Sequence, residues 1–227
     1  MGILPSVIDE RFARSSESSD TLRTVSGDVR RIGRPPRLDR ATILHRAAAV
    51  FSRTGYEGVA VPDLAAELGL THTSLYAAFG SKADLYAQTL EAHADRWRKA
   101  ATEALAEPDL TTAFKVFLQQ QARWLSGLEP DGGLLTRALL THAGRHHREA
   151  ATARRLRGMM VRTVERRVMA AGSVRDRSAR ILALTVMGQV HGMAVLAASG
   201  VPPVELEAVA AGFARMIDLD NADARGA

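Results

Sequence analysis

Side chains that can hydrogen-bond to phosphates and to base edges are concentrated between residues 69 and 86, GLTHTSLYAAFGSKADLY. The polar residues of interest here are His72, Thr73, Ser74, Tyr76 and Lys82. Successive helix residues are 100° apart, so a helix that turns Leu75 toward a core leaves Thr73 and Ala77 facing outward. Hydroxyl, imidazole and phenol groups on such a face can all bond to nucleic acid. This segment is therefore the first candidate for a binding surface.

The neighbouring segments predict the scaffold that holds this face outward. Apolar residues at helical spacing predict one helix over 39–54, stopped by Gly55, and a second over 61–68. Gly69 permits a left-handed turn, and a third helix over 72–79 is expected to bury Leu75, Ala78 and Phe79. Two short helices joined by a glycine turn, behind a packing helix, are typical of a helix-turn-helix module.

The rest of the chain is also helical by its periodicity. Ser81 and Asp84 have the capping-box spacing that begins a fourth helix. About six helices, counting the fourth, are expected over 83–220, with breaks at Pro108, Gly127–Gly133, Gly144, Gly172-Ser173 and Gly200–Pro203. No stretch alternates convincingly like a strand. The predicted fold class is all-α, a three-helix helix-turn-helix domain followed by a larger helical domain, with about nine helices in all.

Residues 38–86 resemble the N-terminal domain of the TetR family of transcriptional repressors. The resemblance lies in the blocks FSRTGYEGV, DLAAELGL and SLYAAFGSK, followed by ADLY. It implies base and phosphate contacts from the third helix and phosphate contacts from Tyr76 and Lys82. With the basic arm RRIGRPPRLD (30–39) included, the expected DNA-binding residues are Arg34, Arg37, Thr71, His72, Thr73, Ser74, Tyr76 and Lys82.

The sequence departs from this family pattern around the second helix. The family commonly places Thr or Ser near positions 59 and 60, where this chain has Val59 and Ala60. Pro62 also occupies a position where some members place a base-reading side chain. We therefore expect DNA binding to depend more on the third helix and the arm.

The resemblance also implies that the last two helices form a homodimer. The apolar run Ile181–Ala198 has the length of a membrane span, but Gln189 and His191 within it favour a buried packing helix. Its small residues, four apart, permit close approach of another helix, although an internal core helix of a monomer has the same pattern. The expected interface residues are Gly188, Gly192, Val195, Leu206, Val209 and Phe213.

An effector pocket for a small apolar or amphipathic molecule is expected among the helices between 97 and 170. The candidate residues are Trp97, Phe117, Trp124, Leu139, His142 and Met159, each of which is also a plausible core residue. The predicted division is a disordered extension and basic arm at 1–33, the helix-turn-helix domain at 34–82, the effector-binding and dimerisation domain at 83–220, and a tail at 221–227.

Composition and missing motifs argue against other classes of protein. The 227 residues include no cysteine, which excludes disulfides and thiolate zinc sites and favours a cytoplasmic protein. His142, His146 and His147 lack a carboxylate at a metal-binding offset. Nucleophile-elbow, Walker and dinucleotide fingerprints are absent, so we expect no enzyme, no cofactor, no metal and no membrane partner.

Three alternatives remain open from the sequence. A net charge of +5 suits a polyanionic partner but also ordinary solubility. Between Arg145 and Arg180 there are 11 arginines against 3 acids, which suits DNA, an anionic effector or a solvated face. The polar third helix could itself be a solvated face, and a DNA-binding protein with this fold could be constitutive or architectural, without any effector.

Overall fold

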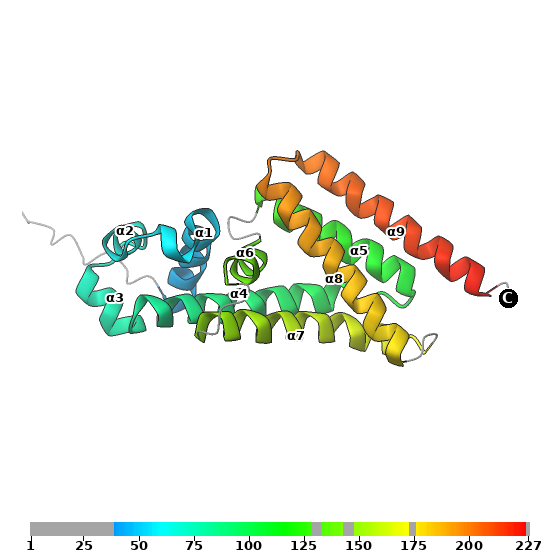
Figure 1. Ribbon diagram of the computed structural model, residues 1–227, viewed down its shortest axis with the longest axis horizontal. Coiled ribbons are helices and arrows are strands. Elements are labelled where there is room, and N and C mark those ends of the chain that lie inside the picture. Colours follow the sequence, from blue (N-terminus) through cyan, green and yellow to red (C-terminus); the bar gives the residue numbers. More distant parts are fainter. Residues whose placement is uncertain (1–38, 129–132, 143–147, 173–175, 226–227) are drawn as a thin grey trace, which may run out of the picture. The chain divides into compact units, whose positions relative to one another are not determined.

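The computed structural model describes residues 39–128, 133–142, 148–172 and 176–225, all within one compact unit, Leu38–Ala227. These residues form nine α-helices and one π-helical segment, and no strand is present among them (Figure 1). The helices are α1 (Arg40–Gly58), α2 (Val61–Glu67), α3 (His72–Phe79), α4 (Lys82–Ala104), α5 (Leu110–Arg123), α6 (Leu134–Thr141), α7 (Arg148–Ala170), α8 (Asp176–Ala198) and α9 (Pro203–Arg225), with the π-helical segment η1 at Trp124–Leu128. The all-α prediction with about nine helices is confirmed.

The first three helices pack around one apolar centre. Phe51 of α1, Leu64 of α2 and Leu75 of α3 are fully buried there. The prediction that Gly55 ends the first helix is only partly correct. Gly55 leaves helical geometry with φ 76° and ψ 169°, yet the chain resumes one more turn to Gly58. A positive φ is readily adopted only by glycine, so Gly55 is a kink and not a stop.

The fourth helix joins these three helices to the remainder. Asp84 and Ser81 form the predicted capping box at its N-terminus, and α4 then continues for 23 residues. It packs against α1 near its start and along α7 over much of its length (Figure 1). One unbroken helix therefore contacts both the helix-turn-helix and the larger helical part.

The last two helices pack on different neighbours. Helix α9 lies along α5, whereas α8 packs against α7 (Figure 1). One face of α8 is buried, including Ala183, Val186 and Met193, while Ile181 and Val195 on the other face are 57% and 50% exposed. The predicted packing helix is therefore buried on one side only.

In the described part of the chain, one helical stretch, Arg177–Ala198, has the length and apolar composition of a membrane span. Core helices of soluble proteins also meet that criterion, and one third of this stretch is buried. Ser173 of the predicted break at Gly172-Ser173 and the arm residues Arg34 and Arg37 lie outside the described residues. The division into domains stays a prediction.

Candidate nucleic-acid interface

Helix α3 turns its two large apolar side chains inward and everything else outward. Leu75 and Phe79 are buried, whereas His72, Thr73 and Ser74 are exposed and Tyr76 is 41% exposed. The prediction that Ala78 is buried is wrong, because this side chain is exposed one residue before Phe79. The ring centroids of His72 and Tyr76 lie 4.6 Å apart, so these two side chains form one contiguous patch.

Both ends of α3 are fixed by local hydrogen bonds. The Thr71 hydroxyl oxygen accepts from the Ser74 backbone N–H at 3.1 Å and lies 2.8 Å from the Ser74 hydroxyl. Thr71 is therefore the N-cap of α3, and the Ser74 hydroxyl is hydrogen-bonded to the hydroxyl of that cap. At the other end Gly80 has φ 81°, and a Cβ there would lie 2.9 Å from Asp84 Oδ2. Glycine is the residue that fits this junction.

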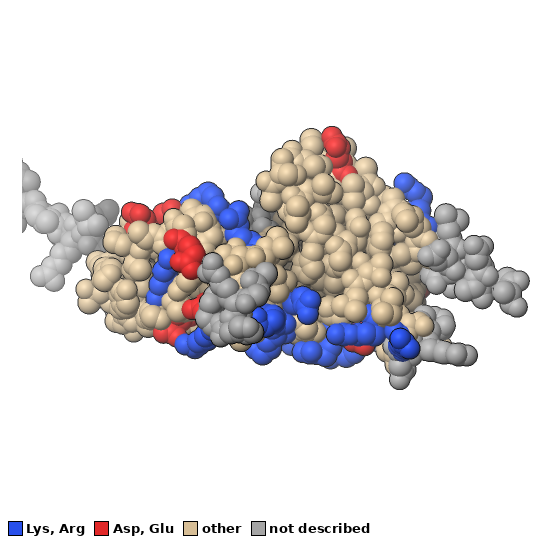
Figure 2. Space-filling view, in the orientation of Figure 1, with Lys and Arg blue, Asp and Glu red and all other residues tan. Residues whose placement is uncertain are grey.

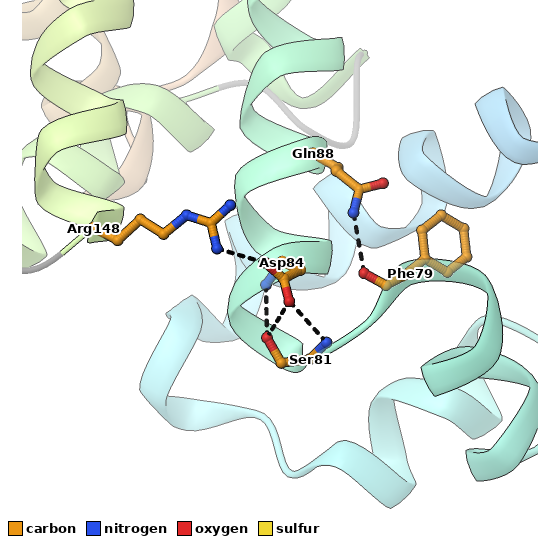
Figure 3. A network of polar contacts seen from close by, with 5 residues as sticks. All are labelled: Phe79, Ser81, Asp84, Gln88 and Arg148. Carbon is orange, nitrogen blue, oxygen red and sulfur yellow. Dashed lines mark hydrogen bonds and ion pairs between the residues drawn. The ribbon is translucent and has the colours of Figure 1, made fainter.

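The C-terminal turn of α3 is attached to α1 and α4 by two side chains. Arg40 Nη1 donates to the Ala78 carbonyl at 2.9 Å, and its guanidinium lies 4.6 Å from the centre of the Phe79 ring. Gln88 Nε2 donates to the Phe79 carbonyl at 3.1 Å (Figure 3), and Gln88 Oε1 accepts from Arg40 Nη2. These bonds satisfy carbonyls that the end of a helix leaves free, and they fix α3 relative to α4.

The N-terminus of α4 carries a second polar network. Ser81 donates to Asp84 from both its hydroxyl, at 2.7 Å, and its backbone N–H, at 3.1 Å. Arg148 of α7 reaches the other carboxylate oxygen at 2.6 Å (Figure 3). The Ser81 hydrogen bonds, reinforced by Arg148, lower the pKa of the Asp84 carboxyl from its ordinary value. The helix cap that follows α3 is thus bonded directly to α7.

Lys82 projects from this same helix start. Its ammonium lies 4.7 Å from the centre of the Tyr56 ring, a cation–π distance. The N-terminal end of a helix carries a positive dipole that attracts phosphate. Because the Asp84 carboxylate there is already bonded to Ser81 and Arg148, Lys82 and the α4 terminus form one cationic corner. Sequence reasoning did not identify Tyr56, Arg40 or Gln88, although Tyr56 stands in the FSRTGYEGV block.

Helix α2 has no side-chain cap at its N-terminus, as Val59 and Ala60 in the sequence led us to expect. Ala60 is its N-cap and offers no side-chain hydrogen bond, and Pro62 lies in its first turn. Helix α2 therefore contributes packing through Leu64 and Ala65 and few exposed polar groups near its start.

The predicted effector residues do not all meet at one place. Trp97 and Trp124 line the same small cavity, and the Phe117 ring packs edge-on against Trp97 with centroids 6.1 Å apart. His142 lies elsewhere, with its ring 6.0 Å from Tyr56 and 5.9 Å from Tyr86. Met159 lines a separate groove with Arg98 and Arg162, and Leu139 is half-buried.

Polar residues that sequence reasoning missed complete the cavity at the tryptophans. They are His93, Gln121, Thr136 and His191, from α4, α5, α6 and α8. Burial, reinforced by Arg96, lowers the pKa of His93 to about 3, and burial, reinforced by Arg157, lowers the pKa of His191. No group of three metal-binding side chains occurs among the described residues, and His146 and His147 fall outside them.

The residues predicted for the dimer interface separate into two groups. Gly188 and Gly192 are exposed on α8 with open space where a Cβ would stand, and Val195 is half exposed. Val209 and Phe213 of α9 are half-buried. Leu206 is fully buried in the chain's own core, so its side chain does not reach the surface.

A helix-turn-helix whose second helix presents polar side chains to solvent, with a cationic corner beside it, defines a DNA-binding protein. Comparison with known proteins agrees with this class. Residues 43–89 match the family model for bacterial regulatory proteins of the tetR family. The chain is 31% identical to a cysteine mutant of the TetR family transcriptional regulator CifR, solved with 26-base-pair operator DNA; the match covers 81% of this chain and 98% of that one with a TM-score of 0.65. The chain belongs to the TetR family of transcriptional regulators.

Curated relatives match over the N-terminal part. An uncharacterized HTH-type transcriptional regulator, YezE of Bacillus subtilis (strain 168), is 38% identical over 77 residues, which are 34% of this chain and 40% of that protein. The HTH-type transcriptional repressor BdcR of Escherichia coli (strain K12) is 35% identical over 78 residues, which are 34% and 36% of the two chains. The matched region thus spans well under half of either curated relative.

Proposed function

We propose that the protein is a homodimeric repressor that binds a palindromic DNA operator and is released from it by a small effector. The observation that carries this proposal is the exposed polar face of α3, which is fixed at its C-terminal end by Arg40 and Gln88. A recognition helix must keep its orientation to dock in the major groove, and these bonds supply that rigidity. His72, Thr73 and Ser74 are then the base-reading candidates. Tyr76, Lys82 and the arm residues Arg34 and Arg37 are the candidates for phosphate contacts.

The dimer is supported by an apolar face that α8 and α9 leave uncovered. Ile181, Leu184 and Val195 of α8 and Met216 of α9 are between 40% and 63% exposed. Figure 2 shows that the surface over these two helices carries few charges, whereas Lys and Arg gather along the edge nearer α7. A groove of about 510 Å³ also runs between α8 and α9, lined by Leu182, Phe213 and Ile217 among others. Apolar surface of this kind marks an interface.

The effector site is supported by the polar cavity between α4, α5, α6 and α8. It lies beside Trp97, on the same helix whose start carries Lys82. A ligand that favours one tilt of α4 therefore changes the placement of α3 in both protomers. Since DNA is the partner, we assign the protein to the cytoplasm, and the proposal includes no enzymatic step.

The test is selection of bound sites from random double-stranded DNA by the full chain. The expected result is a palindrome whose half-sites are about 34–36 Å apart along the duplex, one helical turn. Failure to enrich any motif would contradict operator binding. A motif with a single half-site would contradict the dimer.

The small size of the cavity supports one alternative, a constitutive DNA-binding protein. Its volume is about 20 Å³, far below that of a preformed drug-sized pocket. A thermal-shift screen of small molecules separates the two functions, followed by operator binding with each stabilising compound. The repressor loses operator affinity with at least one such compound, and the constitutive protein with none.

A further inference from the structure

The cavity between α4, α5, η1, α6, α7 and α8 is lined by polar groups that carry no full charge. Six of its lining side chains contribute ring, amide or hydroxyl groups: His93, Trp97, Gln121, Trp124, Thr136 and His191. Leu125, Val190 and other apolar residues complete it, and none of the described lining residues is an acid, a lysine or an arginine. Burial lowers the pKa of both histidines, so their imidazoles are neutral at pH 7.

Two internal hydrogen bonds orient the polar groups. Trp97 Nε1 donates to Gln121 Oε1 at 2.8 Å. This bond engages the carbonyl of the amide and leaves its NH₂ group as the free end. Thr136 Oγ1 and His191 Nδ1 also lie 2.8 Å apart, which leaves Nε2 as the other nitrogen of that ring.

Three nitrogen atoms of these side chains are buried without a hydrogen-bond partner among the described residues. They are Gln121 Nε2, Trp124 Nε1 and His191 Nε2. Gln121 as a whole is only 2% exposed. A buried donor without a partner costs about 1–3 kcal/mol, and native proteins leave few of them. An amide NH₂ and an indole N–H can only donate, so the group that satisfies them is an acceptor.

The backbone that carries Trp124 gives a second, independent indication. Trp124 begins the five-residue π-helical segment η1, and Leu125 of the same segment also lines the cavity. Segments of π-helix are rare and are concentrated at functional sites. The irregular backbone and the unpaired donors therefore occur at the same place in the fold.

We propose that this cavity recognises the effector through an uncharged hydrogen-bond acceptor, a carbonyl oxygen, on an otherwise apolar small molecule. This inference rests on the proposed function, because it names the chemistry of that effector. A carbonyl oxygen has two lone pairs and accepts hydrogen bonds without carrying a charge, which suits a cavity whose unpaired groups include the Gln121 amide NH₂ and the Trp124 indole N–H. An ammonium group would meet donors at both positions. A carboxylate would be desolvated without a charged partner in the lining, because Arg96 and Arg157 are not among the lining residues.

The cavity size limits which part of the molecule fits. About 20 Å³ accommodates one water-sized group, so the oxygen occupies the cavity and the apolar remainder displaces neighbours such as Leu125 and Val190. The effector therefore opens the cavity as it binds.

The chain's own tryptophans test this proposal directly. It has two, and both line the cavity, so tryptophan fluorescence of the full chain reports on this site alone. Titration with 2-hexanone, hexanoate and hexylamine compares an acceptor, an anion and a cation of matched length. We expect a saturable change with 2-hexanone and at least about 10-fold weaker binding of both ions, a difference of about 1.4 kcal/mol. Absence of a saturable response to 2-hexanone overturns the proposal, and so does hexanoate binding as tightly.

Two variants and one control separate hydrogen bonding from packing. Trp124→Phe keeps an aromatic ring but removes the N–H, with Trp97 left as reporter, and Gln121→Leu removes the amide at similar volume. Each should bind 2-hexanone about 3- to 10-fold more weakly, as expected for one neutral hydrogen bond. Gln119→Leu, on the same helix but outside the lining, should bind as the unmodified chain does. Equal affinity in all four proteins overturns the proposal.

Operator binding, measured separately with labelled DNA, distinguishes this inference from the proposed function. If 2-hexanone binds but leaves operator affinity unchanged, the acceptor site stands and the release step of the proposed function fails. If hexanoate releases the operator and 2-hexanone does not, release by an effector stands and the carbonyl inference fails.

Discussion

Among single residues, Lys82 has the most specific expected role. Its ammonium lies near the Tyr56 ring at the start of α4. We expect it to bind a phosphate there and to contact no base. Lys82→Ala should weaken binding to every DNA sequence alike. The slope of log K against log salt should fall in magnitude by about one for each half-site. Filter binding over a range of salt concentrations measures it.

The control for this prediction is Lys99→Ala, which removes an exposed lysine from the C-terminal third of α4. It should leave both affinity and salt slope unchanged. A change of preferred operator in Lys82→Ala, in place of a uniform loss, would show that Lys82 reads bases.

His72, Thr73 and Ser74 should set the sequence preference. All three are exposed at the start of α3, although Ser74 also bonds to the cap residue Thr71. Replacing His72 or Thr73 by Ala should cost about 1–3 kcal/mol at the base pair it contacts. Ser74→Ala also loosens the cap, so its effect includes helix stability. Repeating the site selection with the triple alanine variant is the measurement, and an unaltered motif would refute this role.

His93 should make the fold less stable in acid. Its pKa is about 3 in the folded chain, below the ordinary value of 6.5, because burial disfavours the charged ring. Between these two values the unfolded chain binds the extra proton, so the free energy of unfolding falls as pH falls from 6.5, by up to about 1.4 kcal/mol per pH unit. Urea unfolding at pH 7.5 and pH 5 should show this loss.

A His93→Gln variant should lose less stability than the unmodified chain between these two pH values. His72→Gln, which removes an exposed imidazole, is the control for the loss of one histidine. An identical pH dependence in His93→Gln and the unmodified chain would place the titrating group elsewhere.

At the scale of helices, the attachment of α3 to α4 should matter as much as the contact residues. Gln88 and Arg40 together bond the last two carbonyls of α3. Gln88→Leu should weaken operator binding several-fold while the preferred sequence stays the same, because the reading face is intact but less well fixed. Isothermal titration with operator and with a scrambled site measures both quantities.

The matched control is Arg53→Leu, which breaks the exposed ion pair between Arg53 and Glu67 on α1 and α2. Pairs of this kind contribute about 0–1 kcal/mol, so its operator affinity should hardly change. Equal losses in both variants would mean that the effect of Gln88→Leu is general destabilisation.

The ends of helices were predictable from the sequence where they depend on residues close together in the chain. The Ser81–Asp84 capping box and the Gly69 turn depend on neighbours in sequence, and both are present in the structure. The Arg40–Gln88 pair and the Gln121–Trp97 bond join residues 48 and 24 positions apart, which no local pattern encodes. The exposure of Ala78 was not predicted, because an alanine beside a buried residue is small and apolar enough to lie on either the buried or the exposed side of a helix.

At the scale of the whole molecule, the proposed dimer can be tested without damage to the single chain. Nothing lies within 4 Å of a Cβ built at Gly192, so a side chain there projects from α8 into open space. Gly192→Leu should therefore fold normally but keep two α8 helices apart. We expect monomers in sedimentation and weak operator binding, because one half-site alone remains. Ala151→Leu, exposed on α7, is the control, and an unchanged dimer in Gly192→Leu would place the interface elsewhere.

The length of α4 has a mechanical consequence. At about 1.5 Å per residue, its 23 residues form a rod of about 34 Å. A rotation of only about 3° about one end would carry the other end about 2 Å, most of the length of a hydrogen bond. Helix α3 is bonded to the start of this rod, and Trp97 lies two thirds of the way along it. A displacement too small to disturb packing at the tryptophan therefore suffices to move α3 out of contact with a phosphate. In the proposed function, the response of operator binding to a small molecule therefore depends on the length of α4 and on how firmly its start is bonded to α3.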